Sequence, residues 1–297
     1  MKTPEARVLK QYNLIGDAIY YHHYRTAAVG GEYLHPSEAH ASHEMLLLLE
    51  GEISYVIEGE TYTATQGDMI FVAPGEIHSI RINGSKPYER LVLLFDIDAL
   101  QSMMRDLRVE LEAFSRDRRN RLHIIPRALV EEYGLGKLLF EILECEDADK
   151  YKRLLLLSKL LCFMIQTDKM IAQNKDRLAK PTSTDALVSC VTAYINEHIG
   201  EAIRLEDVAK HLFVSKSTLC HRFASVVHMT TMQYILLKKM HHAADLLQKG
   251  CSAMQAAALV GFDNYTTFFY NYKRLMGEAP VAKRRSGSPA MAEPFMD

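Results

Sequence analysis

Cysteine is scarce in this sequence and follows none of the spacings that bind metals or build disulfide frameworks. Among 297 residues there are five cysteines and no Cys-x-x-Cys pair. An odd number of scattered thiols, most of them on apolar helical segments, argues against a disulfide-stabilised secreted protein and favours reduced thiols in a cytosol. The five residues are Cys145, Cys162, Cys190, Cys220 and Cys251.

Long apolar runs are also missing. The most apolar stretch, Leu154–Ile165, contains Ser158 and Lys159 and is too short to span a bilayer. The opening residues, Met1–Glu5, have none of the features of a signal peptide. We therefore expect a cytoplasmic protein with no membrane partner.

The chain carries little net charge, −2 overall, but the charge is unevenly distributed. Residues 1–181 contain 23 basic and 27 acidic side chains, whereas residues 182–285 contain 12 basic and 8 acidic ones. A length of 297 residues suits two domains. A positive domain that follows a negative one is typical of a DNA-binding domain joined to a domain of another kind.

The residues from 205 to 223 predict a helix-turn-helix unit. Apolar residues recur at helical spacing through residues 205–212 and again at Leu219 and Phe223. Ser215 lies between the two segments and is a natural N-cap for the second helix. A short second helix with an outward polar face has the geometry that enters a DNA major groove. Its outward residues are Lys216, Ser217, Cys220 and His221.

A second unit follows about fifty residues later. Ala253–Val260 predicts a helix that ends at Gly261, and Asp263-Asn264 predicts a turn and cap before a helix over Tyr265–Met276. Either unit alone could be an ordinary helical hairpin, but two units joined by an amphipathic helix (Thr231–Leu247) favour DNA binding. The residues predicted to face DNA are Tyr265, Thr266, Phe269 and Tyr270, with Lys273 and Arg274 near phosphates.

Spaced residues across this region resemble the signature of AraC/XylS-type transcriptional regulators. They are Asp207-Val208-Ala209, Ser215-x3-Leu219-x3-Phe223, Ala243-x2-Leu246-Leu247, Gly261-Phe262, Phe268-x3-Tyr272-Lys273 and Gly277-x2-Pro280. The resemblance implies recognition helices in successive major grooves, with Ser217, Cys220 and His221 as base readers in the first unit and Tyr265, Thr266 and Tyr270 in the second. The sequence departs from the family at His228, usually Gly, at Thr231, usually Pro, at Lys239, commonly Arg, and at Lys283, commonly aromatic.

The nature of these readers bears on the DNA sequence they would select. Cys220, Tyr265 and Tyr270 cannot form the bidentate hydrogen bonds by which Arg or Lys reads guanine. We therefore expect specificity that depends on thymine methyl contacts, water and DNA shape.

The amino-terminal half has a different periodicity. Short β-branched and aromatic runs alternate with turns at residues 51–52, 58–59, 67–68 and 74–75. This pattern predicts an antiparallel barrel or jelly roll. The predicted strands are Met45–Leu49, Glu52–Ile57, Glu60–Ala64, Met69–Ala73, His78–Ile82 and Glu89–Phe95.

Within these strands, His40-x3-Glu44-x6-Gly51 and Gly67-x7-Gly75-x2-His78 resemble the two cupin motifs. The resemblance implies the sensor barrel of sugar-responsive AraC-type regulators. In two respects the sequence departs from the motifs: Glu38 replaces the first histidine, and Pro74 comes one position late.

The barrel should hold a small-molecule effector, because a barrel of this size leaves room for one ligand. A carbohydrate is one candidate, although the residues do not single it out. The candidate effector-binding residues are Arg25, His40, Glu44, Tyr55, His78 and Arg90. Two imidazoles with carboxylates could instead hold Mn, Fe, Ni or Zn, with Glu38, His40, Glu44 and His78 as ligands. We expect these groups to be satisfied by one another, by water or by an effector, and so predict no cofactor or metal.

Helical spacing returns between the two halves, over Ile97–Phe114, Arg127–Cys145 and Tyr151–Gln173. The leucines from 154 to 161 could pack in the domain core or form the seam of a homodimer, as the family resemblance implies. The charged stretch at residues 114–121 predicts a solvated loop or helix end. The predicted domains are an effector-binding and dimerisation domain (1–174, with the barrel at about 18–96 and helices at about 97–174), a linker (175–184), a DNA-binding domain (185–285) and a disordered tail (286–297).

The sequence therefore predicts an α+β protein, with a cupin-like β-barrel (jelly roll) and helices followed by an all-α domain with two helix-turn-helix units. We expect a bacterial, effector-responsive transcriptional regulator that acts as a homodimer on double-stranded DNA, in contact with RNA polymerase, and is not an enzyme. A metal-dependent cupin enzyme and an effector-independent DNA-binding protein are the alternatives.

Overall fold

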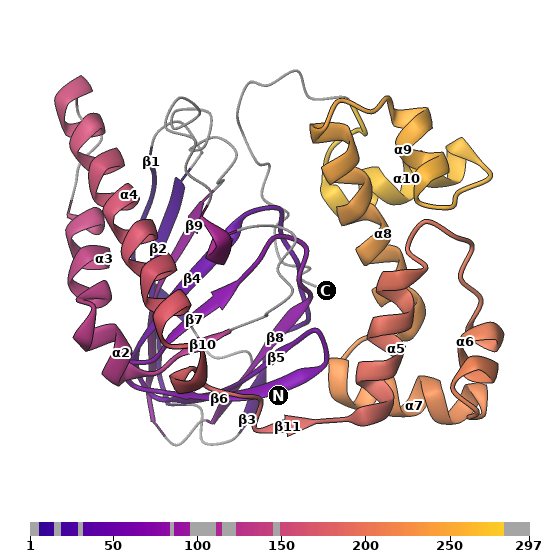
Figure 1. The fold of residues 1–297 in the computed structure, drawn as a ribbon, viewed down its shortest axis with the longest axis horizontal. Coiled ribbons are helices and arrows are strands. Elements are labelled where there is room, and N and C mark those ends of the chain that lie inside the picture. The colour runs from indigo at the N-terminus through magenta and orange to yellow at the C-terminus, as the bar shows by residue number, and fades with distance from the viewer. Residues whose placement is uncertain are drawn as a thin grey trace.

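The computed structural model describes residues 6–14, 19–28, 32–83, 86–95, 111–114, 123–144 and 149–281. A β-rich half with its own helices precedes an all-helical half (Figure 1). Within these residues, no helix has the length and apolar character needed to cross a membrane. The helix predicted over Ile97–Phe114 falls outside the described residues except for a 3-10 turn, η2 (Glu112–Phe114). The stretch 115–121, Cys145 and the tail 286–297 also lie outside them.

Two antiparallel sheets form the β-rich half. In the described residues, the first has the order β1 (Ala6–Leu14), β2 (Ile19–Thr26), β9 (Tyr88–Phe95), β4 (His43–Glu50), β7 (Met69–Val72) and β10 (Ile124–Ile125). The second has the order β11 (Ser183–Thr184), β6 (Glu60–Thr65), β5 (Glu52–Ile57), β8 (His78–Asn83) and β3 (Glu32–Leu34). Apolar residues from both sheets meet in one buried cluster. The predicted cupin-like jelly roll is therefore confirmed.

The six strands predicted from the sequence correspond to β4 to β9 with small differences at their ends. The turns between them depend on glycine: at Gly51 and Gly67, for example, φ is 104° and 93°, values that favour a residue without Cβ. Three strands described before β4 were not predicted individually, and β1 begins at Ala6, ahead of the predicted start of the barrel.

The strand β4, in the middle of the first sheet, is buried on both faces. Along β4, Leu46 and Leu48 point into the barrel, whereas Met45 and Leu47 pack against helices on the outside, because successive strand residues face opposite sides. Burial on both faces explains why this strand reads as a continuous apolar run.

The outer helices are α2 (Arg127–Glu132), α3 (Leu135–Leu143) and α4 (Lys150–Gln173). The sequence predicted one helix over Arg127–Cys145, and the structure corrects this to two. Gly134 lies between them in the left-handed conformation, with φ of 64°. This conformation ends α2, and the chain restarts in a new direction at Leu135.

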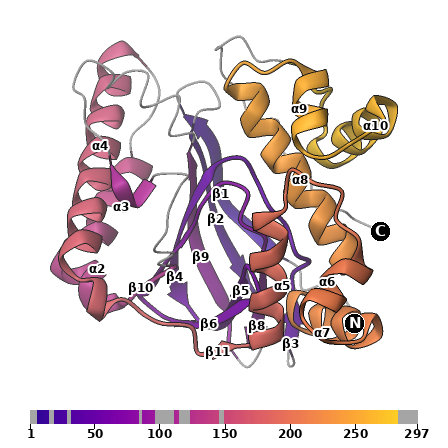
Figure 2. The same ribbon diagram turned by 45° about the vertical axis from the view of Figure 1, so that its right-hand side comes forward.

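The predicted linker is partly integrated into the barrel. After a 3-10 turn, η3 (Lys175–Arg177), the strand β11 pairs antiparallel with β6 at the edge of the second sheet. Asp185 then caps α5 (Ala186–Glu197), accepting hydrogen bonds from the amides of Leu187 and Val188. Figure 2 shows β11 leading from the sheet into α5. The linker is thus held by sheet hydrogen bonds.

The helical half continues with α6 (Leu205–His211), α7 (Lys216–Val227), α8 (Thr231–Gln248), α9 (Ala253–Leu259) and α10 (Tyr265–Met276). Two apolar clusters hold it together, one around α5 to α7 and one around α9 and α10. The long helix α8 contributes Tyr234 and Ile235 to the first cluster and Met240 and Leu247 to the second. In Figure 2, α8 runs between the two units and joins them.

Candidate functional site

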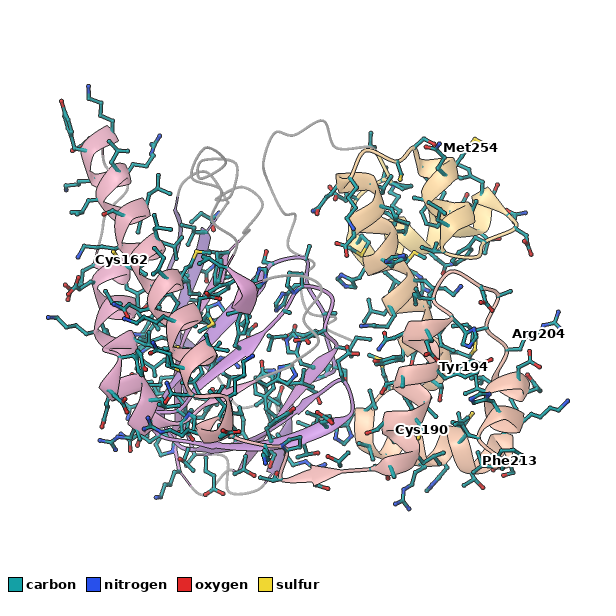
Figure 3. The ribbon with its side chains drawn as sticks, in the orientation of Figure 1. Cys162, Cys190, Tyr194, Arg204, Phe213 and Met254 are labelled. Carbon is teal, nitrogen blue, oxygen red and sulfur yellow. The ribbon has the colours of Figure 1, made fainter. Side chains whose placement is uncertain are left out.

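The first predicted reading helix, α7, is fixed at its start and along its inner side. Ser215 caps it as predicted, its hydroxyl accepting a hydrogen bond from the Thr218 amide at 3.0 Å. Leu219 and Phe223, on the inner side of this helix, are fully buried. Phe213 lies in the turn before the cap, with φ of 53° and a side chain that is 95% exposed (Figure 3).

The outward side of α7 carries the four predicted residues. Ser217 and His221 are exposed, and Cys220 is half-buried. Lys216 is exposed, but its ammonium lies 2.6 Å from the Glu206 carboxylate. A phosphate that approached Lys216 would therefore compete with Glu206 for the same donor.

The second reading helix, α10, is built in the same way. Asn264 caps it as predicted, its side-chain oxygen accepting a hydrogen bond from the Thr267 amide at 3.0 Å. Phe268 and Tyr272 are buried. The exposed residues of this helix include the predicted Tyr265, Thr266, Tyr270, Lys273 and Arg274, whereas Phe269 is half-buried.

A buried lysine joins the two helix-turn-helix units. The Lys239 ammonium, on α8, donates hydrogen bonds to the backbone carbonyls of Glu201 before α6 and Val260 after α9. Burial lowers the pKa of Lys239. Next to this contact, Gly261 has φ of 71°, and a Cβ on it would lie 2.6 Å from the Glu201 carbonyl. The units are thus in direct contact, and the spacing of their reading helices is set by this contact and by α8.

Inside the barrel, four of the six predicted effector-binding residues come together. His40 Nε2 lies 3.0 Å from Glu44 Oε2, and His78 Nε2 lies 3.9 Å from the same oxygen. The Tyr55 hydroxyl donates to Glu44 Oε1 at 2.9 Å. These side chains reach one place from the segment before β4 and from β4, β5 and β8.

Arg90, on β9, lies near this cluster. Its guanidinium donates to the Tyr88 hydroxyl at 2.9 Å and lies 5.6 Å from the centre of the Tyr24 ring. Arg90 Nε is buried without a hydrogen-bond partner among the described residues. Burial would lower the pKa of Arg90, but Tyr88, Glu44 and Tyr55 raise it, so the group stays charged.

The structure does not bring Arg25 together with the other five residues. Arg25 follows Tyr24 on β2, so strand alternation puts it on the opposite face of the sheet. There it is exposed, with its guanidinium 3.1 Å from Glu50 and 3.5 Å from Glu89. The sequence predicted no individual strand over these residues, so it could not assign Arg25 to a face of the sheet.

The same alternation brings in residues that were not predicted. On β2, His22 points inward with Tyr24, and both of its ring nitrogens are buried without hydrogen-bond partners among the described residues. Burial, reinforced by Arg90, lowers the pKa of His22 to about 3 and that of His35 to about 4. Both imidazoles are therefore neutral at pH 7. The period of two along β2 is the signal that could have identified His22.

The charges at the cluster itself are coupled. Burial alone would raise the pKa of the Glu44 carboxyl, but the neighbouring His40, His78 and Arg90 lower it below its usual range. Burial would also lower the pKa of His40, and the bonded Glu44 carboxylate outweighs this and raises it. The site therefore keeps Glu44 as a carboxylate.

A second buried carboxylate, Glu58, connects the barrel to α8. It lies in the turn between β5 and β6, with φ of 52°, and is 5% exposed. The Tyr234 hydroxyl donates to it at 2.6 Å, and the Lys238 ammonium lies 3.2 Å from both of its oxygens. Glu58 also accepts a hydrogen bond from the Ile77 amide at 2.7 Å. We call Glu58, Tyr234 and Lys238 the interdomain cluster.

The loop that carries His40 touches the same helix. The Gly75 amide donates to the His40 carbonyl at 2.8 Å, and the Gly75 carbonyl accepts a hydrogen bond from Lys238 at 3.2 Å. A Cβ on Gly75 would lie 3.3 Å from Cβ of His241, so α8 packs closely on this turn. The polar site in the barrel is thus two hydrogen bonds away from α8.

Comparison with protein families gives two matches. Residues 208–286 match the model of a helix-turn-helix domain, and residues 21–160 match that of the AraC-like ligand binding domain. Together these matches cover the two reading helices, the interdomain cluster and all six predicted effector-binding residues.

Individual relatives are distant. The chain is 24% identical over 273 residues to the uncharacterized HTH-type transcriptional regulator YfiF of Bacillus subtilis (strain 168), covering 89% of this chain and 83% of YfiF. It is 27% identical over 110 residues to the uncharacterized HTH-type transcriptional regulator YdiP of Escherichia coli (strain K12), covering 37% of this chain and 36% of YdiP. The chain thus matches little more than a third of the length of YdiP.

Among solved structures, an apo form of ToxT from Vibrio cholerae strain SCE256 matches 91% of this chain and 97% of its own, with 14% identity and a TM-score of 0.40.

Proposed function

The chain belongs to the AraC-type transcriptional regulators, and from this premise we propose that an effector in the barrel controls, through α8, how a homodimer of the chain binds double-stranded DNA. A protein of this kind would act in the bacterial cytoplasm, together with RNA polymerase, and would not be an enzyme.

The exposure of both reading helices is the observation that carries the DNA-binding part of the proposal. Ser217 and His221 on α7, and Thr266 and Tyr270 on α10, are all exposed, although the barrel packs against the same domain. Lys273 and Arg274 lie in the last turn of α10, where their charges could meet phosphates. The domain can thus approach DNA without first leaving the barrel.

The effector site we propose is the inward polar cluster of the barrel. Arg90 Nε and both ring nitrogens of His22 are buried without partners in the described residues, and buried polar groups are normally satisfied. A ligand rich in hydrogen-bond acceptors and donors would satisfy them. The rings of Tyr24 and Tyr88 border Arg90 and offer the flat surfaces against which a sugar ring could lie. A carbohydrate has this chemistry, as do other small polar molecules.

The interdomain cluster supports a route from this site to the DNA-binding domain. A ligand that moves Gly75 or the turn at Glu58 would alter the hydrogen bonds of Lys238 and Tyr234 on α8. Because α8 packs against both helix-turn-helix units, this would shift the population of the arrangement that fits adjacent half-sites.

An exposed apolar stripe on α4 supports the homodimer. Leu156 and Leu160 are buried in the domain, whereas Tyr151, Leu154 and Leu155 are 70%, 64% and 51% exposed. They lie on one side of the helix at intervals of three and four residues. Exposed apolar groups gathered in this way mark contact surfaces more often than isolated ones do. A second copy of α4 is the partner we propose.

A DNA-binding experiment with effector candidates tests the proposal. Sugars and small acids are screened for a shift in Tm of the full chain, and hits are added to a titration of its genomic DNA targets at fixed salt. We expect at least one hit to raise Tm and to change the DNA affinity. A ligand that raises Tm and leaves DNA affinity unchanged would contradict the coupling and favour an effector-independent regulator. Turnover of a hit would favour the cupin enzyme.

A further inference from the structure

A cavity of about 280 Å³ lies outside the barrel, where the second sheet, the linker and α7 meet. These three parts lie together at the lower edge of the molecule in Figures 1 and 2. Sites for small molecules usually have volumes of about 300 to 1,000 Å³. The cavity therefore has room for one small ligand, in a place separate from the polar cluster inside the barrel.

The barrel side of the cavity carries an arginine that faces outward. Ser54 on β5 and Arg81 on β8 lie opposite each other in the sheet. Their neighbours along both strands belong to the buried cluster inside the barrel, so strand alternation places Ser54 and Arg81 on the outer face. The Arg81 guanidinium lies 3.4 Å from Nε2 of His228, at the end of α7. Because a guanidinium only donates, Nε2 accepts, and the neutral ring carries its proton on Nδ1.

His228 lines the cavity from a backbone conformation that favours glycine. It is the C-cap of α7, with φ of 59°, and a residue with a Cβ adopts this conformation at an energetic cost. Backbone conformations of this kind cluster at ligand-binding sites. Burial, reinforced by Arg81, lowers the pKa of His228, so the ring is neutral at pH 7. The imidazole therefore adds an uncharged N–H donor beside the Arg81 guanidinium.

The α7 side of the cavity carries a second arginine, Arg222. Its Nε donates to one oxygen of the Asp185 carboxylate, and the other oxygen accepts from the amides of Leu187 and Val188. Both oxygens of Asp185 are thus engaged, whereas the terminal nitrogens of Arg222 have no hydrogen-bond partner in the part of the chain that the structure describes. Two guanidinium groups against one carboxylate leave the lining with an excess of one positive charge.

Hydrogen bonds already hold the walls of the cavity together. The Ser37 hydroxyl, from the segment before β4, donates to the Val227 carbonyl at 2.6 Å and so fixes the end of α7 on the barrel. The pair of Arg222 with Asp185 fixes the same helix to the start of α5. Because these groups are in place without a ligand, less conformational freedom is lost on binding.

We propose that this cavity binds the phosphate group of a small phosphorylated metabolite. Arginine binds phosphate through paired N–H groups, and here Arg81 and Arg222 supply them from two domains. The hydroxyls of Ser54 and Thr184, which have no hydrogen-bond partner among the described residues, supply further donors. A phosphate monoester has three terminal oxygens that accept from several directions, whereas a carboxylate has two in one plane. The site lies outside the barrel and goes beyond the proposed function, and only its regulatory consequence rests on that function.

A phosphate held between Arg81 and Arg222 would join the barrel to the reading helix α7. A ligand stabilises the state that binds it, so the docked arrangement of α7 would become more populated. DNA affinity would then respond to this ligand even when the barrel is empty.

Calorimetric titration of the full chain tests the site, with glycerol 3-phosphate as the probe and succinate, which carries a similar charge, as the comparison. We expect saturation by glycerol 3-phosphate at one equivalent, a higher Tm for the loaded protein, and binding of succinate that is at least about tenfold weaker, because succinate leaves donors unsatisfied. The Arg81→Gln variant should bind glycerol 3-phosphate at least about tenfold more weakly, since it loses a charge-assisted hydrogen bond.

Two further variants keep the result interpretable. His228→Gly removes the ring at a position whose backbone suits glycine, so it should fold, and it should bind the probe about two- to tenfold more weakly through loss of one neutral donor. Arg274→Gln is the control, because Arg274 is exposed in the last turn of α10 and does not line the cavity. It should bind the probe as the unaltered chain does.

Three results would overturn the site. They are absence of saturable binding, equal binding of succinate, and loss of binding in Arg274→Gln with none in Arg81→Gln and His228→Gly, which would place the anion on the DNA-binding surface. DNA binding by the phosphate-free chain is measured separately. A chain that binds glycerol 3-phosphate in the cavity but no DNA would contradict the proposed function alone.

Discussion

The hydroxyl of Tyr234, on the helix that joins the two helix-turn-helix units, donates a 2.6 Å hydrogen bond to the carboxylate of Glu58, in a turn of the barrel. Both side chains are buried, and they are 176 residues apart in the sequence. Lys238 shares the carboxylate. In the docked arrangement, the cation and the hydroxyl stabilise the buried carboxylate. When the domains separate, the carboxylate must be solvated by water instead.

Tyr234→Phe tests whether this contact restrains the DNA-binding domain. The variant removes one hydrogen bond to a charged group, which should lower the free energy of unfolding by about 1.5 to 3 kcal/mol. If docking limits the arrangements open to the domain, DNA affinity without effector should rise and the response to effector should shrink. Urea unfolding and DNA titration at one salt concentration measure both effects.

Tyr194→Phe is the matched control for that substitution. Tyr194 lies on α5 and contacts His198 and His211. Because Tyr194 is not part of the interdomain cluster, Tyr194→Phe should leave DNA affinity unchanged. Equal DNA affinities for Tyr234→Phe and the unaltered chain, with and without effector, would show that the interdomain cluster stabilises the fold without controlling DNA binding.

Lys239→Met tests how the two units are held together. The substitution keeps most of the apolar stem but leaves the carbonyls of Glu201 and Val260 without their donor. Each unsatisfied buried group costs about 1 to 3 kcal/mol, so we expect a large loss of stability in thermal unfolding. Binding to a site with two half-sites should fall more than binding to a single half-site. Lys249→Met, at the exposed end of α8, should change stability by less than about 0.5 kcal/mol.

The parts of the fold that could be predicted depend on neighbours in sequence. The caps at Ser215 and Asn264 satisfy amides three residues away, and the strands from β4 to β9 are separated by short turns. The break between α2 and α3 has a local signal in the sequence too, which is the glycine at position 134. In the structure Gly134 adopts φ of 64°. That signal was outweighed by the apolar periodicity on either side of it.

The rest could not be predicted because it depends on pairing between distant segments. Which face of β2 lies inside the barrel is set by its pairing with β9, where Tyr24 lies opposite Arg90 and Arg25 opposite Glu89. This register excludes Arg25 from the pocket and includes His22. The contact of Glu58 with Tyr234 and Lys238 likewise requires the docking of two domains, for which a single sequence carries no periodic signal.

His221→Ala and Lys273→Ala should have different effects on DNA binding. His221 lies on the outward side of α7, so its removal should relax base preference at one position of the site, at a cost of about 1 to 3 kcal/mol. Lys273 lies in the last turn of α10, so its removal should weaken binding to all DNA sequences alike. The number of ions released on binding, obtained from the salt dependence of the affinity, should fall by about one. Selection of bound sequences at two salt concentrations measures both. A change of base preference in Lys273→Ala would contradict this division of roles.

Leu155→Glu tests the proposed seam on α4. Leu155 is 51% exposed and lies beside Leu154, so a carboxylate there should cost the monomer little. In a symmetric contact, two copies of the new charge would lie close together and would have to lose their hydration. We expect the dissociation constant of the dimer, measured by sedimentation velocity, to increase at least tenfold. Binding to paired half-sites should weaken. Gln166→Glu adds the same charge to an exposed position of the same helix and is the control. A Leu155→Glu chain that sediments as the unaltered protein does would place the contact between copies elsewhere on the molecule.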